Sequence, residues 1–201
     1  LVSMAPNNEV GGIRTALAMG AAKAILVSDP ALAGSDSLGT AKVLAAAIKR
    51  AEPDLVLTAT ESSDGYTGTV PEQLAGLLDL PSVTFAKQIA VGDGKVSVQR
   101  QTEQGYDDVE CPMPAVVSVT AGVVEPRYPS FKGIMAAKSK PVDELTVADL
   151  GLDAGQVGWA GGQQEIVDVS AAEARQAGEI IEDDGEAHLK IVEFLDQLKV
   201  L

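Results

Sequence analysis

The first 80 residues alternate between two patterns of hydrophobic and polar positions. The short runs at residues 24–28 and 54–58 are too apolar for either face to be solvated, which predicts buried parallel strands. Apolar residues at helical spacing follow these runs, at about 39–50 and 70–79. Strands and helices that alternate in this way favour an α/β fold built on a doubly wound, mostly parallel sheet.

The pattern changes from residue 82 onward. Short alternating apolar runs lie on both sides of the turn sequence at 92–95, which predicts antiparallel strands added to the sheet. The apolar run at 114–119 then predicts another buried strand. We therefore expect residues 1–140 to form one α/β domain.

Residues 141–201 lose this periodicity and are expected to form an extended C-terminal arm. Within the arm, the pattern predicts a short strand at 164–170 and an amphipathic helix at about 185–198. Such an arm packs either on another chain or back on its own domain, and the sequence leaves both alternatives open.

The composition limits the partners of this chain. Hydrophobic residues make up 46% and aromatic residues only 3%, so the core is built from Ala, Val, Leu and Ile. The formal net charge of −14 disfavours binding to nucleic acid and to anionic membranes, whereas a basic partner stays open. No apolar run approaches the roughly 20 residues of a membrane span, so we expect no membrane insertion.

The residues that most often carry chemistry are scarce. With the single cysteine Cys111, no disulfide and no cysteine-based metal site can form within the chain. The only histidine, His188, lies in the polar C-terminal helix without an accompanying nucleophile. Acidic pairs such as Asp107-Asp108 are typical of a solvated surface in a chain this acidic. We therefore expect a binding protein without a reaction centre of its own.

Two loops follow predicted strands, where doubly wound sheets bind their ligands. Residues 3–12 lead into a helix at about 13–20, whose N-terminus could hold a phosphate, although the loop has neither a dinucleotide-binding nor a Walker A motif. A plain strand-to-helix turn is the alternative for this first loop.

The second loop, at residues 59–69, is rich in hydroxyl groups, and its glycines at 65 and 68 permit close backbone approach. Thr67 and Thr69 are placed to cap the next helix, but capping explains only part of this set.

The segment 124–138 contains the most informative residue of the chain. Pro126, Pro129 and Gly133 stiffen it, and Phe131 stands between Ser130 and Lys132 with nothing apolar nearby to bury it. We interpret it as a rigid loop that offers an aromatic side chain to a partner.

Three segments carry a resemblance to the beta subunit of electron-transfer flavoproteins. The stretch 125–135 resembles the family signature, the helix at 13–21 follows the family's first phosphate-side loop, and 59–70 takes the place of its adenine-nucleotide loop. The resemblance extends over nearly the whole chain, including the arm. It implies an adenine nucleotide alpha hydrolase-like fold and an arm that packs on the partner subunit.

The resemblance also implies a function. Members of the family are alpha–beta heterodimers in which FAD lies mainly on the alpha subunit and the beta subunit buries a structural AMP. They take electrons from acyl-CoA dehydrogenases and similar flavoenzymes during fatty acid oxidation, and pass them to a membrane-bound quinone oxidoreductase. The chain is then an electron carrier subunit rather than an enzyme. It is expected in the bacterial cytoplasm, or in the mitochondrial matrix if the source is eukaryotic.

Two sets of site residues follow from the resemblance. The residues expected to bind AMP are Met4, Ala59, Asp64, Gly65, Thr67, Gly68, Thr69 and Val70. The residues expected to dock partners are Arg127, Tyr128, Pro129, Phe131, Ile134 and Met135, with Phe131 as the apolar anchor that enters a pocket on the dehydrogenase.

The chain also departs from the family pattern. The family has a further strand–helix unit before the segment at which this chain starts, so we expect residues upstream of Leu1 to be missing. The loop at 59–70 is richer in hydroxyl groups than in the animal proteins and resembles the actinobacterial form.

Three alternative functions stay open. A relative that bifurcates electrons would hold a second FAD at the AMP site. A stand-alone nucleotide-binding enzyme of the ATP-pyrophosphatase or universal-stress type would need a positioned cation, and Arg14 is the only basic residue near either loop. A purely structural partner domain is the third alternative.

Overall fold

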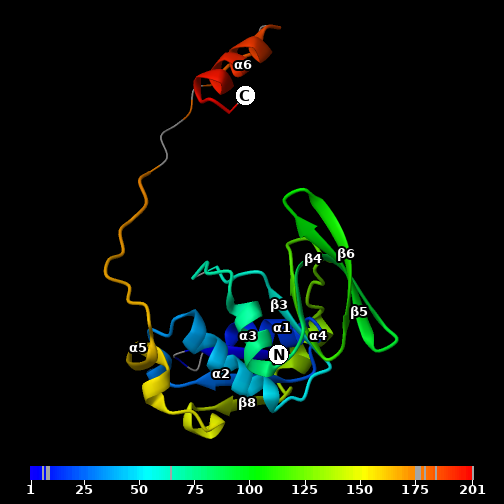
Figure 1. Cartoon of the computed structure of the whole chain (residues 1–201), viewed down its shortest axis with the longest axis vertical. Coiled ribbons are helices and arrows are strands. Elements are labelled where there is room, and N and C mark those ends of the chain that lie inside the picture. The colour runs from blue at the N-terminus through cyan, green and yellow to red at the C-terminus, as the bar shows by residue number, and fades with distance from the viewer. Residues whose placement is uncertain are drawn as a thin grey trace. The chain divides into compact units, whose positions relative to one another are not determined.

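The computed structural model describes residues 1–5, 7, 10–63, 65–174, 178, 180–183 and 185–200 (Figure 1). These residues fall into two compact units, Leu1–Glu165 and Ile166–Leu201, and each unit is described by itself. In chain order the elements are β1 (Val2–Ala5), α1 (Gly11–Ala18), β2 (Ala24–Ser28), η1 (Pro30–Leu32), α2 (Ser37–Lys49), β3 (Leu55–Ala59), α3 (Val70–Leu78), β4 (Ser82–Gly92), β5 (Lys95–Thr102), β6 (Gly105–Pro112), β7 (Ala115–Val119), α4 (Phe131–Ala137), β8 (Val142–Leu145), η2 (Ala148–Leu150), η3 (Ala154–Gln156), α5 (Gly158–Gly161) and α6 (Ala187–Gln197).

The described strands of the first unit form two sheets. One has the order β1-β2-β8 and is parallel throughout. The other has the order β3-β7-β4-β5-β6, in which β3, β7 and β4 are parallel and β4, β5 and β6 are antiparallel. The predicted α/β class, with mostly parallel strands and added antiparallel ones, is confirmed. The strands lie in two sheets rather than one, a difference that local patterns could not predict because they identify strands but not the edges that pair.

Helix α2 packs against both sheets. Its Val43 lies in a cluster with Val27 of β2, and its Ala45 lies in a second cluster with Val56 of β3 and Val116 of β7. Small side chains let a helix approach a sheet closely, so both clusters pack tightly despite the scarcity of aromatic residues. Helix α2 therefore joins two sheets that share no ladder within the described residues.

The antiparallel strands bury apolar side chains of their own in a third hydrophobic cluster. Val96 and Val98 of β5 and Cys111 of β6 pack with Ala115 and Val117 of β7. Figure 1 shows β4, β5 and β6 extending beyond the helices of the first unit. Burial raises the pKa of the Cys111 thiol, in agreement with a cysteine that fills space in a core.

Part of the expected arm belongs to the first unit. Strand β8 pairs in parallel with β2, and the division between the units falls after Glu165, so it does not coincide with the expected boundary at residue 140. The strand predicted at 164–170 is wrong, because these residues carry no strand assignment. Its alternating apolar residues have the composition of a strand, but a single strand without a neighbour is not stable.

The second unit contains helix α6, which confirms the helix predicted at about 185–198 within two residues at each end. Exposed apolar side chains are common along this unit: Ile166, Val167, Val169, Ile180, Leu189, Ile191, Val192, Phe194 and Leu198. None of the hydrophobic clusters found among the described residues includes a side chain of this unit.

The loop after β2 contacts residues near the end of the first unit. Trp159, the only tryptophan, lies so close to Gly34 that a Cβ atom there would come within 2.1 Å of the indole. Asp36 accepts hydrogen bonds from the Gly39 N–H at 2.7 Å and from the Gln163 N–H at 2.7 Å. Asp36 therefore caps α2 and also holds the chain where the first unit ends.

We predict that Asp36→Ala lowers the free energy of unfolding by about 1–2 kcal/mol, because the helix loses its N-cap. The Gly39 and Gln163 N–H groups hold the pKa of the Asp36 carboxyl below its usual value. The stabilisation is therefore complete above a pH of roughly 4 and is lost as the pH falls through the folded-state pKa. Urea titrations followed by Trp159 fluorescence at neutral and acidic pH would measure this difference.

Asp36→Ser is the matched control, since serine keeps the cap without the charge. It should restore most of the stability at neutral pH and remove the acid-dependent part. A loss of stability in Asp36→Ala that stays constant into acid would show that the carboxylate is not responsible.

Candidate functional site

The loop after β3 carries most of the predicted cofactor-binding residues. Ala59 ends β3, Val70 begins α3, and Gly65, Thr67, Gly68 and Thr69 lie in the loop between them. Asp64 lies outside the described residues. Except for Thr60, which is partly buried, the hydroxyl-bearing residues of this loop are exposed, and Gly68 adopts a φ of +63°, which favours glycine. The structure thus brings these residues together on one open loop.

The expectation that Thr69 caps α3 is wrong. Thr69 occupies the N-cap position, but its side chain makes no capping hydrogen bond. Pro71 in the first turn already lacks an N–H group, which reduces the need for a cap. The Thr69 hydroxyl is therefore available to a ligand.

A buried hydroxyl group lies beside this loop. Thr58 Oγ1, one residue before the end of β3, is buried and has no hydrogen-bond partner among the described residues. An unsatisfied buried hydroxyl costs free energy, and a bound polar group is one way to satisfy it. The position of Thr58 at the strand end fits a ligand held by the 59–70 loop.

The remaining cofactor-binding candidate, Met4, lies on β1 in the other sheet. It packs against the cluster that contains Ile25 and Val27. The loop after β1 lies largely outside the described residues. Helix α1 then begins at Gly11 without a side-chain cap and without an acidic residue in its first turn. No hydrogen bond in the described part of the chain joins Met4 to the 59–70 loop.

The predicted docking segment contains helix α4, which sequence analysis interpreted as a loop. The helix spans Phe131–Ala137, and the Ser130 side chain caps it by accepting a hydrogen bond from the Gly133 N–H at 3.0 Å. A serine before a run of good helix formers is the signal that could have predicted it. The prolines that suggested a stiff loop both precede the helix.

Helix α4 exposes an apolar face. Phe131 is 81% exposed, and Ile134 and Met135, one turn further along, are about half exposed at 47% and 51%. Tyr128 is 86% exposed just before the helix, Arg127 is also exposed, and Pro129 is partly buried. Except for Pro129, the predicted docking residues therefore lie at the surface together.

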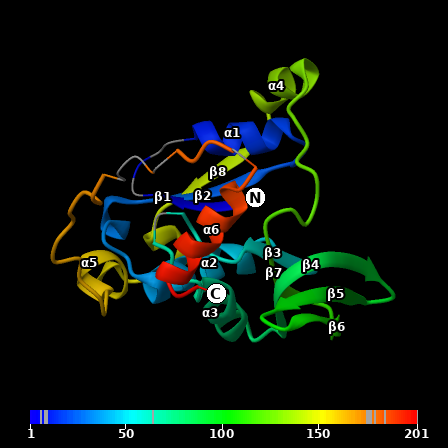
Figure 2. The same cartoon turned by 90° about the horizontal axis from the view of Figure 1, so that it is seen from above.

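The inner face of α4 packs on α1. A Cβ atom on Gly133 would come within 2.4 Å of the Ala18 carbonyl oxygen, so the two backbones are in direct contact. Ala137 is buried in a cluster with Leu17 of α1 and Leu26 of β2. Figure 2 shows α4 beside α1 and away from the antiparallel strands. Helix α4 is thus supported by α1.

The loop that leads to α4 is fastened where it leaves the sheet. Both the N–H and the hydroxyl of Thr120 donate to the Ala86 carbonyl oxygen, at 3.0 and 3.3 Å. The Lys87 ammonium group donates to the Ala121 carbonyl oxygen at 3.1 Å. The neighbouring Phe85 has a φ of +58°, and its N–H donates to the buried Ser118 hydroxyl at 3.1 Å.

Arg14 points toward α4 rather than toward a phosphate loop. Its Nη1 donates to the carbonyl oxygens of Ala137 at 2.8 Å and Lys140 at 2.6 Å. The basic residue that a stand-alone nucleotide enzyme would need is therefore engaged in a helix–helix contact.

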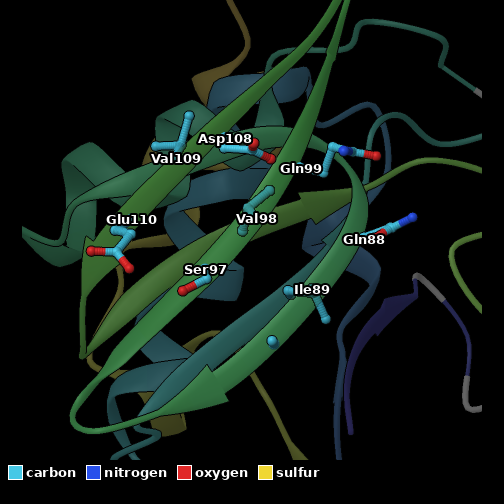
Figure 3. A pocket seen from close by; sticks show the side chains of 9 residues that line it. Gln88, Ile89, Ser97, Val98, Gln99, Asp108, Val109 and Glu110 are labelled. Carbon is cyan, nitrogen blue, oxygen red and sulfur yellow. The ribbon is translucent and has the colours of Figure 1, made fainter.

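The antiparallel strands form a separate hollow of about 490 Å³. Figure 3 shows that its labelled side chains come from three neighbouring strands, with Gln88 from β4, Gln99 from β5 and Asp108 from β6 among them. Glu110, which lines the hollow, forms an ion pair with Lys95 at 2.7 Å, and this ion pair holds the pKa of Glu110 below its usual value. None of the predicted site residues lines this hollow.

The described residues offer neither a metal site nor a membrane-spanning helix. They contain no group of three or more histidine, cysteine, aspartate or glutamate residues that could hold a metal ion. None of the helices in this part of the chain is long and apolar enough to cross a membrane.

Comparison with known proteins identifies the family. The model of the electron transfer flavoprotein domain matches residues 1–150. The chain belongs to the electron transfer flavoprotein family. It is 40% identical to the electron transfer flavoprotein subunit beta of Mycobacterium leprae over 100% of this chain and 76% of that protein. The subunits beta of Mycobacterium tuberculosis, at 38% identity, and Thermoanaerobacterium thermosaccharolyticum, at 36%, are also matched over the whole chain and over 76% and 78% of their own lengths.

The resemblance to the beta subunit is therefore confirmed, and with it a role in electron transport. The relatives' names describe them as beta subunits of an electron transfer flavoprotein. The assignment of individual residues to a nucleotide and to a partner stays a prediction.

Proposed function

We propose that this chain is the beta subunit of a heterodimer that accepts electrons from acyl-CoA dehydrogenases and related flavoenzymes and passes them to a quinone oxidoreductase. FAD, carried mainly by the alpha subunit, supplies the redox chemistry when it is bound. The observation that carries the proposal is the exposed apolar face of α4 on a chain of this family. The cytoplasm of a bacterium, or the mitochondrial matrix of a eukaryote, is the compartment that this role implies.

The α4 face has the form of a transient docking site. A small apolar centre surrounded by polar groups supplies most of the binding energy in such interfaces. Phe131 provides the centre, and Ile134 and Met135 widen it by one turn. Arg127 and Lys132 lie at its border and offer charge to an acidic partner surface.

The loop at 59–70 is the proposed AMP site. Its exposed hydroxyl groups, the open backbone at Gly68 and the unsatisfied Thr58 hydroxyl offer hydrogen bonds to a nucleotide. The first turn of α3 has no side-chain cap, so its free N–H groups are also available to a phosphate. These groups bind and orient an adenylate, and none of them is placed to transfer a proton or a phosphate.

The second unit is the proposed contact with the alpha subunit. Ile166, Val167 and Phe194 are 71%, 90% and 55% exposed, and the run 182–186 between them is acidic. Apolar groups on both sides of an acidic run fit a partner surface with apolar grooves and a basic rim.

We predict that AMP raises the melting temperature of nucleotide-free protein. A ligand that binds only the folded state at 100 times its Kd adds about 2.7 kcal/mol, or a shift of about 5–10 °C for a chain of this size. Differential scanning fluorimetry with AMP, adenosine and FAD would measure it. A shift with FAD but not with AMP would support the second-flavin alternative, and no shift with either would contradict a nucleotide site.

For the docking face, Phe131→Ala should raise the KM of an acyl-CoA dehydrogenase for the heterodimer at least about tenfold, which corresponds to about 1.4 kcal/mol. Stopped-flow and steady-state assays of FAD reduction would measure the change. The melting temperature and the AMP content should not change, because an exposed side chain contributes little to stability. Phe131→Leu is the matched control and should retain most of the affinity. If Phe131→Ala loses AMP but docks as well as the unaltered protein, the docking interface lies elsewhere.

For the arm, Phe194→Asp should weaken the affinity between the subunits about tenfold or more, since it replaces an apolar contact by a charge. Titration calorimetry of the two subunits, with Glu193→Gln as the neighbouring control, would measure the change. Unaltered affinity together with a lower melting temperature of the isolated chain would show that the arm folds back on its own domain.

A further inference from the structure

Two basic side chains connect α1 and α4 in opposite directions. Arg14, in α1, donates from Nη1 to the carbonyl oxygens of Ala137 and Lys140 at 2.8 and 2.6 Å. Lys140, just after α4, donates from Nζ to the carbonyl oxygens of Leu17 and Ala21 at 2.7 and 2.6 Å. Each cation thus binds carbonyl groups at or just beyond the C-terminus of the other helix.

The acceptors explain why these are strong contacts. The last carbonyl groups of a helix lack intrahelical partners and carry partial negative charge, so a cation there is favourable. Hydrogen bonds with a charged donor are roughly twice as strong as neutral ones. Arg14 and Lys140 are both partly buried, which protects the contacts from water. Neither cation forms a salt bridge with a carboxylate among the described residues.

The two contacts complement the close approach at Gly133. The glycine brings the first turn of α4 against Ala18, the last residue of α1, and the cations fix the same pair of helices at the C-terminal end of α4. A helix held at one point can rock, whereas one held at several points along its length has a fixed direction. The direction of α4 decides where Phe131, at its N-terminus, points.

We infer that Arg14 and Lys140 are positioning residues that orient α4 for docking to the dehydrogenase. The inference rests on the proposed docking role of Phe131. The two cations act through the helix and do not touch the partner themselves. Their loss should leave the apolar face present but misdirected, so that docking weakens while the flavin, the nucleotide and the heterodimer are retained.

The principal test is Lys140→Met in the complete heterodimer, which keeps the aliphatic stem and removes the ammonium group. The KM of an acyl-CoA dehydrogenase for the flavoprotein should rise about fivefold to tenfold, with kcat changed less than about twofold. Lys140→Arg should recover most of the affinity, because a guanidinium group can reach the same carbonyl oxygens. FAD content and subunit affinity should equal those of the unaltered protein.

Lys138→Met is the matched control for charge. Lys138 is exposed two residues before Lys140 and makes no side-chain hydrogen bond within the described residues. If positive charge alone attracted the dehydrogenase, both lysine variants would raise KM equally, and the inference would be overturned. A fivefold or greater effect confined to Lys140→Met supports it.

A steric variant tests the same idea without altering charge. Gly133→Ala places a methyl group 2.4 Å from the Ala18 carbonyl oxygen and should push α4 away from α1. It should raise KM as Lys140→Met does, and this keeps the inference testable if the lysine variant fails to fold. An unaltered KM in a folded Gly133→Ala protein would contradict an orienting contact.

A double-variant cycle separates this inference from the proposed function. If Lys140 acts through Phe131, adding Lys140→Met to Phe131→Ala should raise KM less than about twofold further. Fully additive effects would overturn the positioning role. If Phe131→Ala alone has no effect, the docking proposal itself is wrong. If Phe131→Ala raises KM and Lys140→Met does not, only the positioning role is wrong.

Discussion

The packing of α2 is the interaction on which the first unit depends. The two sheets of this unit share no backbone ladder within the described residues, so hydrogen bonding alone does not join them. Helix α2 presents Val43 to one sheet and Ala45 to the other, and Val2 of β1 packs against both clusters. In a chain with only 3% aromatic residues, close contact between many small side chains replaces the large rings that often fill a core. The strand ends that form the candidate nucleotide site are positioned by this contact.

Much of the fold could be predicted because its elements carry strong local patterns. The apolar runs at 24–28 and 114–119 became β2 and β7 with boundaries that differ by one residue at most, because strands buried on both faces cannot be polar. The helical spacing of apolar residues predicted α6 equally well. The division into two sheets could not be predicted, since it depends on which edges meet. The run at 164–170 has the composition of a strand, but a strand also needs a neighbour.

In the candidate sites, features set by neighbouring residues could be predicted from the sequence, whereas features set by contacts between distant residues could not. The exposure of Phe131 could be anticipated from its polar neighbours, whereas the helix that carries it depends on the Ser130 cap. The contacts of Arg14 and Lys140 join residues more than 100 positions apart, so no local pattern could reveal them. Thr58 lies within an apolar run, and only the fold shows that its hydroxyl is buried with no hydrogen-bond partner among the described residues.

The loop between Thr120 and Ser130 is held in place at both of its ends. Its first residues are bonded to β4 through the Ala86 carbonyl oxygen, and its far end enters a helix capped by Ser130. Between these two ends, residues 124–128 are exposed and have no share in the core clusters. Substitutions there can accumulate without disturbing the sheet. Under the proposed docking role, a lineage can thus acquire new redox partners by altering a few surface positions, while the sheets behind them are inherited unaltered.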